Sequence, residues 1–199
     1  IGLFGRDSVE KYIKKGINPG KEIFIITDVR FPARHTLPKG GHDEILVCCN
    51  LVDDLNAVRA CVSAFINRGY KVRLRPHPQD KRRLPRMPGV KVSRSLDIWT
   101  DLSHACAVIA NESAVHLEAA YFCVNTFKLI TFSRSFDNYG FLKHSLIKKE
   151  YPAVQDLIVD LEAGVQNFNE DVVEYFTGDI AKSKLLLDAF RQKIEIMSI

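Results

Sequence analysis

Two segments of the sequence combine polar groups that could bind a nucleotide. One runs from Arg73 to Pro78 and places an imidazole, His77, at the end of a short apolar strand. The other runs from Asn111 to Ala120 and supplies a hydroxyl and a carboxylate early in an expected helix. Ligands of open α/β sheets bind at the carboxyl ends of strands, where helices begin and offer unpaired N–H groups to anions. We therefore expect the two segments to take the phosphate and the ribose of one nucleotide.

His77 is the candidate catalytic residue. Its neighbours Pro76 and Pro78 fix the backbone and remove two N–H donors, so the strand must end there and present the ring in a defined direction. Such an imidazole can donate to a phosphate oxygen and, when charged, help a diphosphate leave. A histidine that only caps a loop is the alternative. Arg73 and Arg75 alternate with apolar residues and so point to one sheet face, and we expect one of them to reach the phosphates.

The second segment contributes Ser113 and Glu118. Ser113 is expected at the N-cap or in the first turn of the helix, which is a phosphate-binding position as well as a simple cap. Glu118 lies among apolar residues, so its carboxylate needs a partner or a ligand. A ribose diol would suit it, and a salt bridge to Arg75 or Lys128 is the structural alternative. Three more residues complete the substrate-binding candidates beside Arg75, Ser113 and Glu118: Pro78, Asn111 and Asn50, the last as a contact to donor phosphates.

Composition restricts the class of protein. A chain of 199 residues with 46% hydrophobic and 26% charged residues is typical of a globular protein with one or two domains. The net charge of +4 is too small to indicate nucleic-acid binding, and we expect no nucleic-acid partner. Basic residues are concentrated between Lys81 and Arg94, a pattern more typical of a solvated loop than of a binding patch.

Cysteine usage and hydropathy indicate where the protein works. The five cysteines are an odd number and show no CxxC spacing, so we expect buried free thiols in a reducing compartment and neither a disulfide framework nor a zinc site. There is no signal-peptide pattern and no apolar run long enough to cross a bilayer. We expect a cytoplasmic domain that acts in solution or at the inner face of the cytoplasmic membrane.

The alternation of strands and helices predicts the fold. Apolar runs indicate strands at 45–49, 72–75, 90–93, 105–110 and 126–130. Helices are expected from 55 to 66, closed by Gly69, in a short segment capped by Ser95, and from 113 to 122. This order predicts an α/β fold, a Rossmann-like doubly wound parallel sheet with right-handed crossovers.

Three parts follow along the chain. Residues 1–43 are expected to be a crossover segment from a preceding domain and a linker, with a helix at 8–15 and a strand at 22–27. Residues 44–150 are the expected Rossmann-like nucleotide-binding domain. Residues 151–199 are expected to form C-terminal helices at 154–161, 170–176 and 180–196.

The residues that carry these expectations resemble a known family. Arg-Pro-His-Pro at 75–78 together with Ser-Ala-Val-His-Leu-Glu-Ala at 113–119 is similar to the donor half of GT-B glycosyltransferases. The likeness is greatest to the sialyl-, polysialyl- and Kdo-transferases of bacterial capsules and lipopolysaccharides, which carry a His-Pro motif, and to glycerophosphotransferases. Residues 7–17 and 21–27 also resemble the end of the acceptor domain in such proteins. The resemblance implies that His77 and Ser113 contact the donor phosphate and that Glu118 holds the ribose or base.

The resemblance also implies partners and extent. It implies a CMP- or CDP-activated sugar donor, a glycan or lipid-linked acceptor, and catalysis with no metal or other cofactor. A two-domain transferase needs about twice this length, so the chain looks like the carboxyl-terminal half of a longer protein. We therefore expect it to bind a nucleotide and to transfer no sugar by itself. Two alternatives stay open: a nucleotide-sugar epimerase of the same fold, and a non-catalytic interaction domain.

Overall fold

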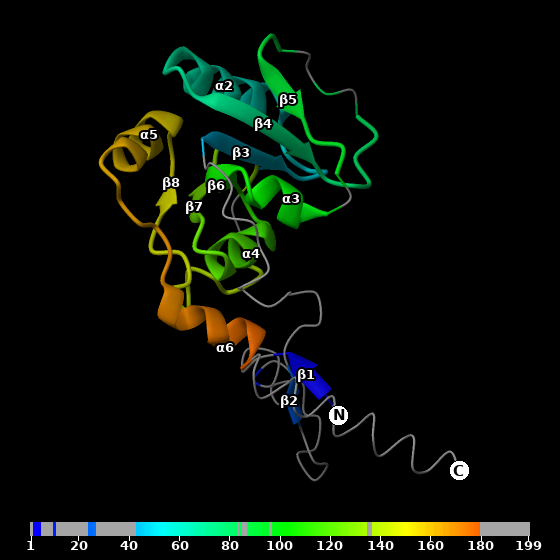
Figure 1. The fold of residues 1–199 in the computed structure, drawn as a ribbon, viewed down its shortest axis with the longest axis vertical. Helices are drawn as coiled ribbons and strands as arrows, with labels where there is room; N and C mark the ends of the chain where they lie inside the picture. Colours follow the sequence, from blue (N-terminus) through cyan, green and yellow to red (C-terminus); the bar gives the residue numbers. More distant parts are fainter. Residues whose placement is uncertain are drawn as a thin grey trace. The chain divides into compact units, whose positions relative to one another are not determined.

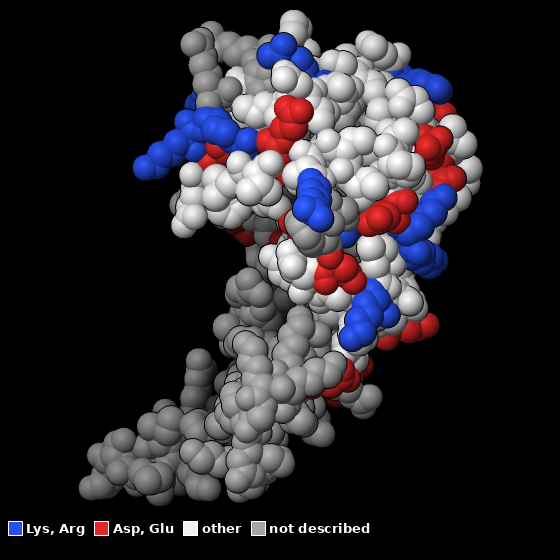
Figure 2. Space-filling view, turned by 180° about the vertical axis from the view of Figure 1, so that it is seen from behind, with Lys and Arg blue, Asp and Glu red and all other residues white. Residues whose placement is uncertain are grey.

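The computed structural model of the protein describes residues 2–4, 10, 24–26 and 43–179, apart from residues 83, 85, 86, 96, 135 and 136. The chain divides into two compact units, one formed by residues 37–170 and the other by residues 1–36 with 171–199. The two units are described separately. On the face shown in Figure 2, basic and acidic side chains are intermixed, in keeping with the small net charge.

The first unit is built on a parallel sheet of six strands in the order β5-β4-β3-β6-β7-β8 (Figure 1). The strands are β3 (Glu44–Cys49), β4 (Lys71–Pro76), β5 (Val90–Val92), β6 (Ala105–Ala110), β7 (Asn125–Leu129) and β8 (Glu150–Tyr151). Counted along this unit, the order is 3-2-1-4-5-6, which is that of doubly wound nucleotide-binding sheets. The expected α/β Rossmann-like fold is therefore confirmed, and the strand order reverses between β3 and β6.

Helices cover both faces of the sheet (Figure 1). They are α2 (Leu55–Asn67) and α5 (Val154–Glu162) on one face, and α3 (Ile98–Leu102) and α4 (Val115–Tyr121) on the other. The central strand β3 is buried along its whole length. Its side chains alternate, so that Ile45 and Val47 pack under α2 while Leu46 and Cys48 pack under α3 and α4. This two-sided burial explains why the strand reads as a continuous apolar run.

The start of α3 differs from the expectation. Asp97, and not Ser95, is the N-cap, because its carboxylate accepts the Trp99 N–H at 2.9 Å. Ser95 is engaged one turn earlier, where its hydroxyl donates to the Asp97 carbonyl and accepts the Asp97 N–H. A serine and an aspartate two residues apart are both good caps, and the local turn decides between them.

The cysteines are all free, as expected, but they are not all buried. Cys48, Cys49 and Cys61 are buried, Cys106 is half-buried, and Cys123 is exposed. The expectation was wrong for the last two. Cys123 is exposed because it lies in the turn that ends α4, outside the helix that the apolar pattern describes.

The second unit contains a two-stranded parallel pair and a short helix. Strand β1 (Gly2–Phe4) pairs with β2 (Phe24–Ile26), which confirms the centre of the strand expected at 22–27. Helix α6 (Val173–Thr177) belongs to this unit and follows the single turn η2 (Glu170–Val172). Of the helix expected at 8–15, only Glu10 is described, and it is helical. The helix expected at 180–196 lies outside the described residues.

Two further expectations concern the chain as a whole. Strand β8 and helix α5 belong to the same compact unit as the rest of the sheet, and this unit ends at Glu170. The domain boundaries expected at 43 and 150 stay predictions. Among the described residues, no helix is long and apolar enough to cross a membrane.

Helices α2 and α4 end in the same hydrogen-bonded motif with different residues at the critical position. After α2, Gly69 donates to the Ile66 carbonyl and Tyr70 to that of Phe65. After α4, Cys123 donates to the Ala120 carbonyl and Val124 to that of Ala119. The φ angle is 85° at Gly69 and 59° at Cys123, which is the left-handed region that favours glycine.

We predict that Cys123→Gly raises the free energy of unfolding by about 0.5–1 kcal/mol, because the relieved strain exceeds the entropy that glycine adds to the unfolded chain. The reciprocal control is Gly69→Ala, which should lower it by about 1 kcal/mol. A Cβ at Gly69 would meet no atom within 4 Å, so that cost is backbone strain alone. Urea unfolding measures both variants. A destabilised Cys123→Gly protein would contradict the prediction.

Candidate functional site

A cleft of about 580 Å³ opens at the carboxyl edge of the sheet. Its walls come from the loops that follow four strands, β3, β4, β6 and β7. The lining residues are Asn50, Leu51, Val52, His77, Glu112, Ser133, Arg134, Asn138 and Tyr139. Because the strand order reverses between β3 and β6, the cleft lies where doubly wound sheets bind their ligands. Two residues expected from the sequence, Asn50 and His77, line it.

The hydrogen bonds of His77 fix its orientation and tautomer. Its backbone N–H donates to the Cys49 carbonyl at 2.9 Å, and its carbonyl accepts the Asp80 N–H at 2.8 Å. In the ring, Nδ1 accepts the Gln79 N–H at 3.2 Å. A ring nitrogen that accepts cannot carry the proton of the neutral imidazole, so that proton lies on Nε2. His77 can therefore present an N–H donor to a ligand in the cleft.

Asn50 connects the two loops at the point where the strand order reverses. Its backbone N–H donates to Oδ2 of Asp53 at 2.7 Å, which closes the turn after β3. Its side-chain Nδ2 donates to the backbone carbonyl of Glu112 in the loop after β6. A carbonyl only accepts, so this bond also fixes which way the Asn50 amide points.

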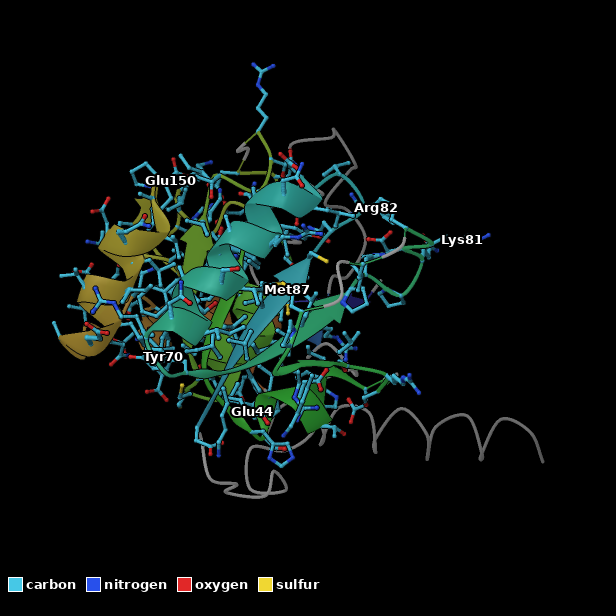
Figure 3. All side chains as sticks on the ribbon, turned by 90° about the horizontal axis from the view of Figure 1, so that it is seen from above. Glu44, Tyr70, Lys81, Arg82, Met87 and Glu150 are labelled. Carbon is cyan, nitrogen blue, oxygen red and sulfur yellow. The ribbon has the colours of Figure 1, made fainter. Side chains whose placement is uncertain are left out.

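Arg82 holds the loop after β3 against the loop after β4. Its guanidinium donates to the backbone carbonyls of Asn50 and Asp53, both at 2.6 Å. The same group pairs with the buried Asp80 carboxylate at 2.7 Å, and this hydrogen bond lowers the pKa of Asp80. The basic run was expected to be solvated, which is wrong for Arg82 because backbone carbonyls engage it. Lys81 is exposed and extends away from the body of the protein (Figure 3).

Hydrogen bonds among Asp53, Ser133 and Asn111 support the part of the cleft formed by the loop after β7. The Ser133 hydroxyl donates to Oδ1 of Asp53 at 2.8 Å. Asn111 donates through Nδ2 to the Ser133 carbonyl at 2.8 Å and is 2.9 Å from its hydroxyl oxygen. Asn111 is 1% exposed, so it supports the lining residue Ser133 from behind. Burial raises the pKa of Asp53. Neither Asp53 nor Ser133 was singled out from the sequence.

Glu112 is a lining carboxylate that the sequence analysis also missed. Its Oε2 lies 3.2 Å from Nζ of Lys128, a cation that is 2% exposed and also lies 3.5 Å from Glu150. Its Oε1 accepts the backbone N–H of Tyr139 at 3.2 Å. The Tyr139 ring stacks on Phe141 with centroids 5.1 Å apart. The signal was present in the sequence, because Glu112 directly precedes Ser113 in the segment that was singled out.

The two arginines of β4 lie on the same sheet face, as expected, but their guanidinium groups pair with carboxylates of β3 and α3. Arg75 pairs with Asp101 and donates to the Ser95 carbonyl at 3.1 Å. Arg73 pairs with Glu44 at 2.7 Å and approaches Asp101 at 3.4 Å. Neither arginine is among the residues that line the cleft.

The remaining candidates, Pro78, Ser113 and Glu118, are not among the residues that line the cleft. Pro78 is exposed beside His77. Ser113 was expected at the N-cap or in the first turn of the helix, which is wrong, because Ala114 is the N-cap of α4. Ser113 lies one residue earlier, where its hydroxyl accepts the Val115 N–H at 3.3 Å. Glu118 lies in the first turn of α4, a helix that packs against β3. The ligand-binding roles of these residues stay predictions.

The contacts of His116 are those of a buried structural residue. It is 1% exposed, with Nδ1 2.7 Å from the Thr126 hydroxyl and Nε2 2.7 Å from the Asn111 carbonyl. Burial lowers its pKa to about 4. Within the part of the chain that the structure describes, no group of three or more His, Cys, Asp or Glu side chains could hold a metal ion.

Solved structures share this fold. The wall teichoic acid polymerase TagF is 13% identical, with a TM-score of 0.61 over 98% of this chain and 58% of that chain. A histidine-to-asparagine variant of TagF soaked with CDPG is 14% identical, with a TM-score of 0.63 over 100% of this chain and 57% of that chain. The glycosyltransferase SnogD from Streptomyces nogalater is 15% identical, with a TM-score of 0.53 over 90% of this chain and 60% of that chain.

These similarities establish the fold. At such identities the likeness concerns architecture alone, and the architecture is the Rossmann-like one of GT-B glycosyltransferases. The chain spans less than two thirds of the length of the proteins that it matches. No protein-family model matches the sequence, and a search of curated proteins found no match.

We predict that His116 makes stability depend on pH between about pH 6.5 and pH 4. Its pKa is lowered from 6.5 to about 4, so the unfolded chain binds a proton in this range that the native protein does not. The contribution of the neutral His116 to the free energy of unfolding is fully present above about pH 6.5. It falls by about 3 kcal/mol as the pH drops to about 4. Urea unfolding at a series of pH values measures this loss. Equal pH dependence in wild type and His116→Gln would contradict the assignment.

Proposed function

We propose that this chain is the nucleotide-sugar-binding domain of a glycosyltransferase, with a CMP- or CDP-activated donor, in the synthesis of a bacterial surface polysaccharide. The observation that carries the proposal is the position of His77. His77 lines a cleft at the point where the order of the parallel strands reverses, and its ring can offer an Nε2–H donor. An N–H donor at this edge suits a phosphate oxygen.

The proposed chemistry of His77 is stabilisation of the leaving nucleotide. A sugar donor releases a nucleoside mono- or diphosphate, and negative charge grows on its phosphate oxygens as the bond breaks. A fixed donor aimed at that charge stabilises the transition state more than the ground state. The hydrogen bond from Gln79 to Nδ1 keeps the donor on Nε2. Ser113 is proposed as a second phosphate contact, and Glu118 as a ribose contact.

The similar structures favour this choice over the nucleotide-sugar epimerase. TagF and SnogD are a polymerase and a glycosyltransferase, and TagF was soaked with CDPG, which favours a cytidine nucleotide as the donor carrier. Nothing among them supports a nucleotide-sugar epimerase. The acceptor, a glycan or a lipid-linked chain at the inner membrane face, is part of the proposal.

We predict that His77→Ala weakens binding of CMP and CDP by about 1.5–3 kcal/mol and leaves cytidine binding nearly unchanged, because the lost hydrogen bond is to a charged phosphate. Isothermal titration calorimetry measures all three ligands. The matched control is His104→Ala, because His104 is exposed and its carbonyl accepts the Glu44 N–H at the amino edge of the same sheet. An equal loss for nucleoside and nucleotide would show that His77 has no phosphate role.

A further inference from the structure

Two of the residues that line the cleft, Asn50 and Glu112, offer hydrogen-bond acceptors to a ligand. The Asn50 amide uses its Nδ2 on the Glu112 carbonyl, so the atom it can offer to a ligand is Oδ1. Among the described residues, no group donates to that oxygen. An amide oxygen with a fixed direction can accept from a ligand hydroxyl or amino group, and it disfavours a phosphate oxygen, which is itself an acceptor.

The carboxylate of Glu112 is the second of these acceptors. Among the described residues, Lys128 pairs with Oε2 and the Tyr139 N–H donates to Oε1, whereas a carboxylate can accept about four hydrogen bonds. The side chain is 17% exposed and lines the cleft, whereas Lys128 is buried behind it. The buried cation offsets the cost of holding a partly buried carboxylate there.

A third acceptor lies behind the same wall. Oδ1 of Asn111 is buried and has no hydrogen-bond partner among the described residues. Its amide nitrogen is held by Ser133, which lines the cleft. A ligand group that brings donors would suit the two acceptors that line the cleft, Oδ1 of Asn50 and the Glu112 carboxylate.

We propose that Asn50 and Glu112 form a subsite for a vicinal diol of the ligand, beside the phosphate position of His77. A diol brings two O–H donors on adjacent carbons, which matches an amide oxygen and a carboxylate on residues that are hydrogen-bonded to each other. The proposal rests on the proposed function and refines it. Asn50, expected from the sequence to contact the donor phosphates, would instead accept a hydrogen bond from a ligand hydroxyl. If the diol is that of the ribose, Glu112 takes the role of ribose contact that was proposed for Glu118.

The diol has two possible sources, the ribose of the nucleotide and the transferred polyol or sugar. Calorimetry with two ligand pairs distinguishes them. The pair CMP and 2′-deoxy-CMP reports on the ribose, and the pair CDP and CDP-glycerol reports on the transferred group. In the wild type, CMP should bind more tightly than 2′-deoxy-CMP, or CDP-glycerol more tightly than CDP, by roughly tenfold or more. A hydrogen bond to a charged group contributes a binding free energy of this size.

The variants are Glu112→Gln and Asn50→Ala, with Glu150→Gln as the matched control. Glu150 is also a carboxylate near Lys128, at 3.5 Å, and it is not among the residues that line the cleft. In the ligand pair that the wild type discriminates, we expect Glu112→Gln and Asn50→Ala each to reduce the affinity ratio by about fivefold or more. Glu150→Gln should leave this ratio unchanged. Asn50→Ala decides the matter if Glu112→Gln fails to fold.

Three outcomes would overturn the inference. Ratios unchanged in both folded variants would mean that Asn50 and Glu112 bind no diol. An equal loss in Glu150→Gln would mean that the charge balance of Lys128 is responsible, and a loss in Glu118→Gln in place of Glu112→Gln would restore the earlier ribose assignment. In all three outcomes the protein still binds nucleotides, so the proposed function stands. A wild-type protein that binds none of the four ligands would instead refute the proposed function and this inference with it.

Discussion

The cleft depends on the hydrogen bonds that Arg82 makes to the chain directly after the central strand. Strand β3 is buried on both faces, and its chain leaves the sheet at Asn50 into a loop whose carbonyls need donors. The Arg82 guanidinium supplies two of them, to Asn50 and Asp53, at 2.6 Å each. Asp80 holds the guanidinium from the other side. The loops after β3 and β4 therefore form one hydrogen-bonded structure, and this structure presents both Asn50 and His77.

The same logic extends to the other two loops. Asp53 accepts the Ser133 hydroxyl from the loop after β7, and Asn50 donates to the Glu112 carbonyl in the loop after β6. Glu112 in turn holds the backbone of Tyr139. The polar groups of the cleft are therefore held in place by hydrogen bonds before a ligand binds. Binding would then cost little free energy for ordering them. Preorganised donors are also what stabilises charge on a leaving phosphate.

The sequence allowed the scaffold to be predicted but not the network that shapes the cleft. Strands such as 105–110 are apolar runs of the right length, and the order of elements restricts the topology. His77 was identifiable because two prolines flank it. Ser133 and Asp53 lie 80 positions apart, so no local pattern could pair them. Arg82 was hidden in a basic run, because composition cannot show which cation meets a backbone carbonyl.

The most direct test of the account is where a cytidine nucleotide binds. Titration of the ¹⁵N-labelled protein with CMP, followed by backbone amide chemical shifts, locates the ligand without any mutation. The account predicts that the largest shifts occur in the loops that line the cleft, at Asn50, His77, Glu112 and Tyr139. Shifts confined to the amino edge of the sheet, around Glu44 and His104, or no shifts at millimolar CMP, would contradict it.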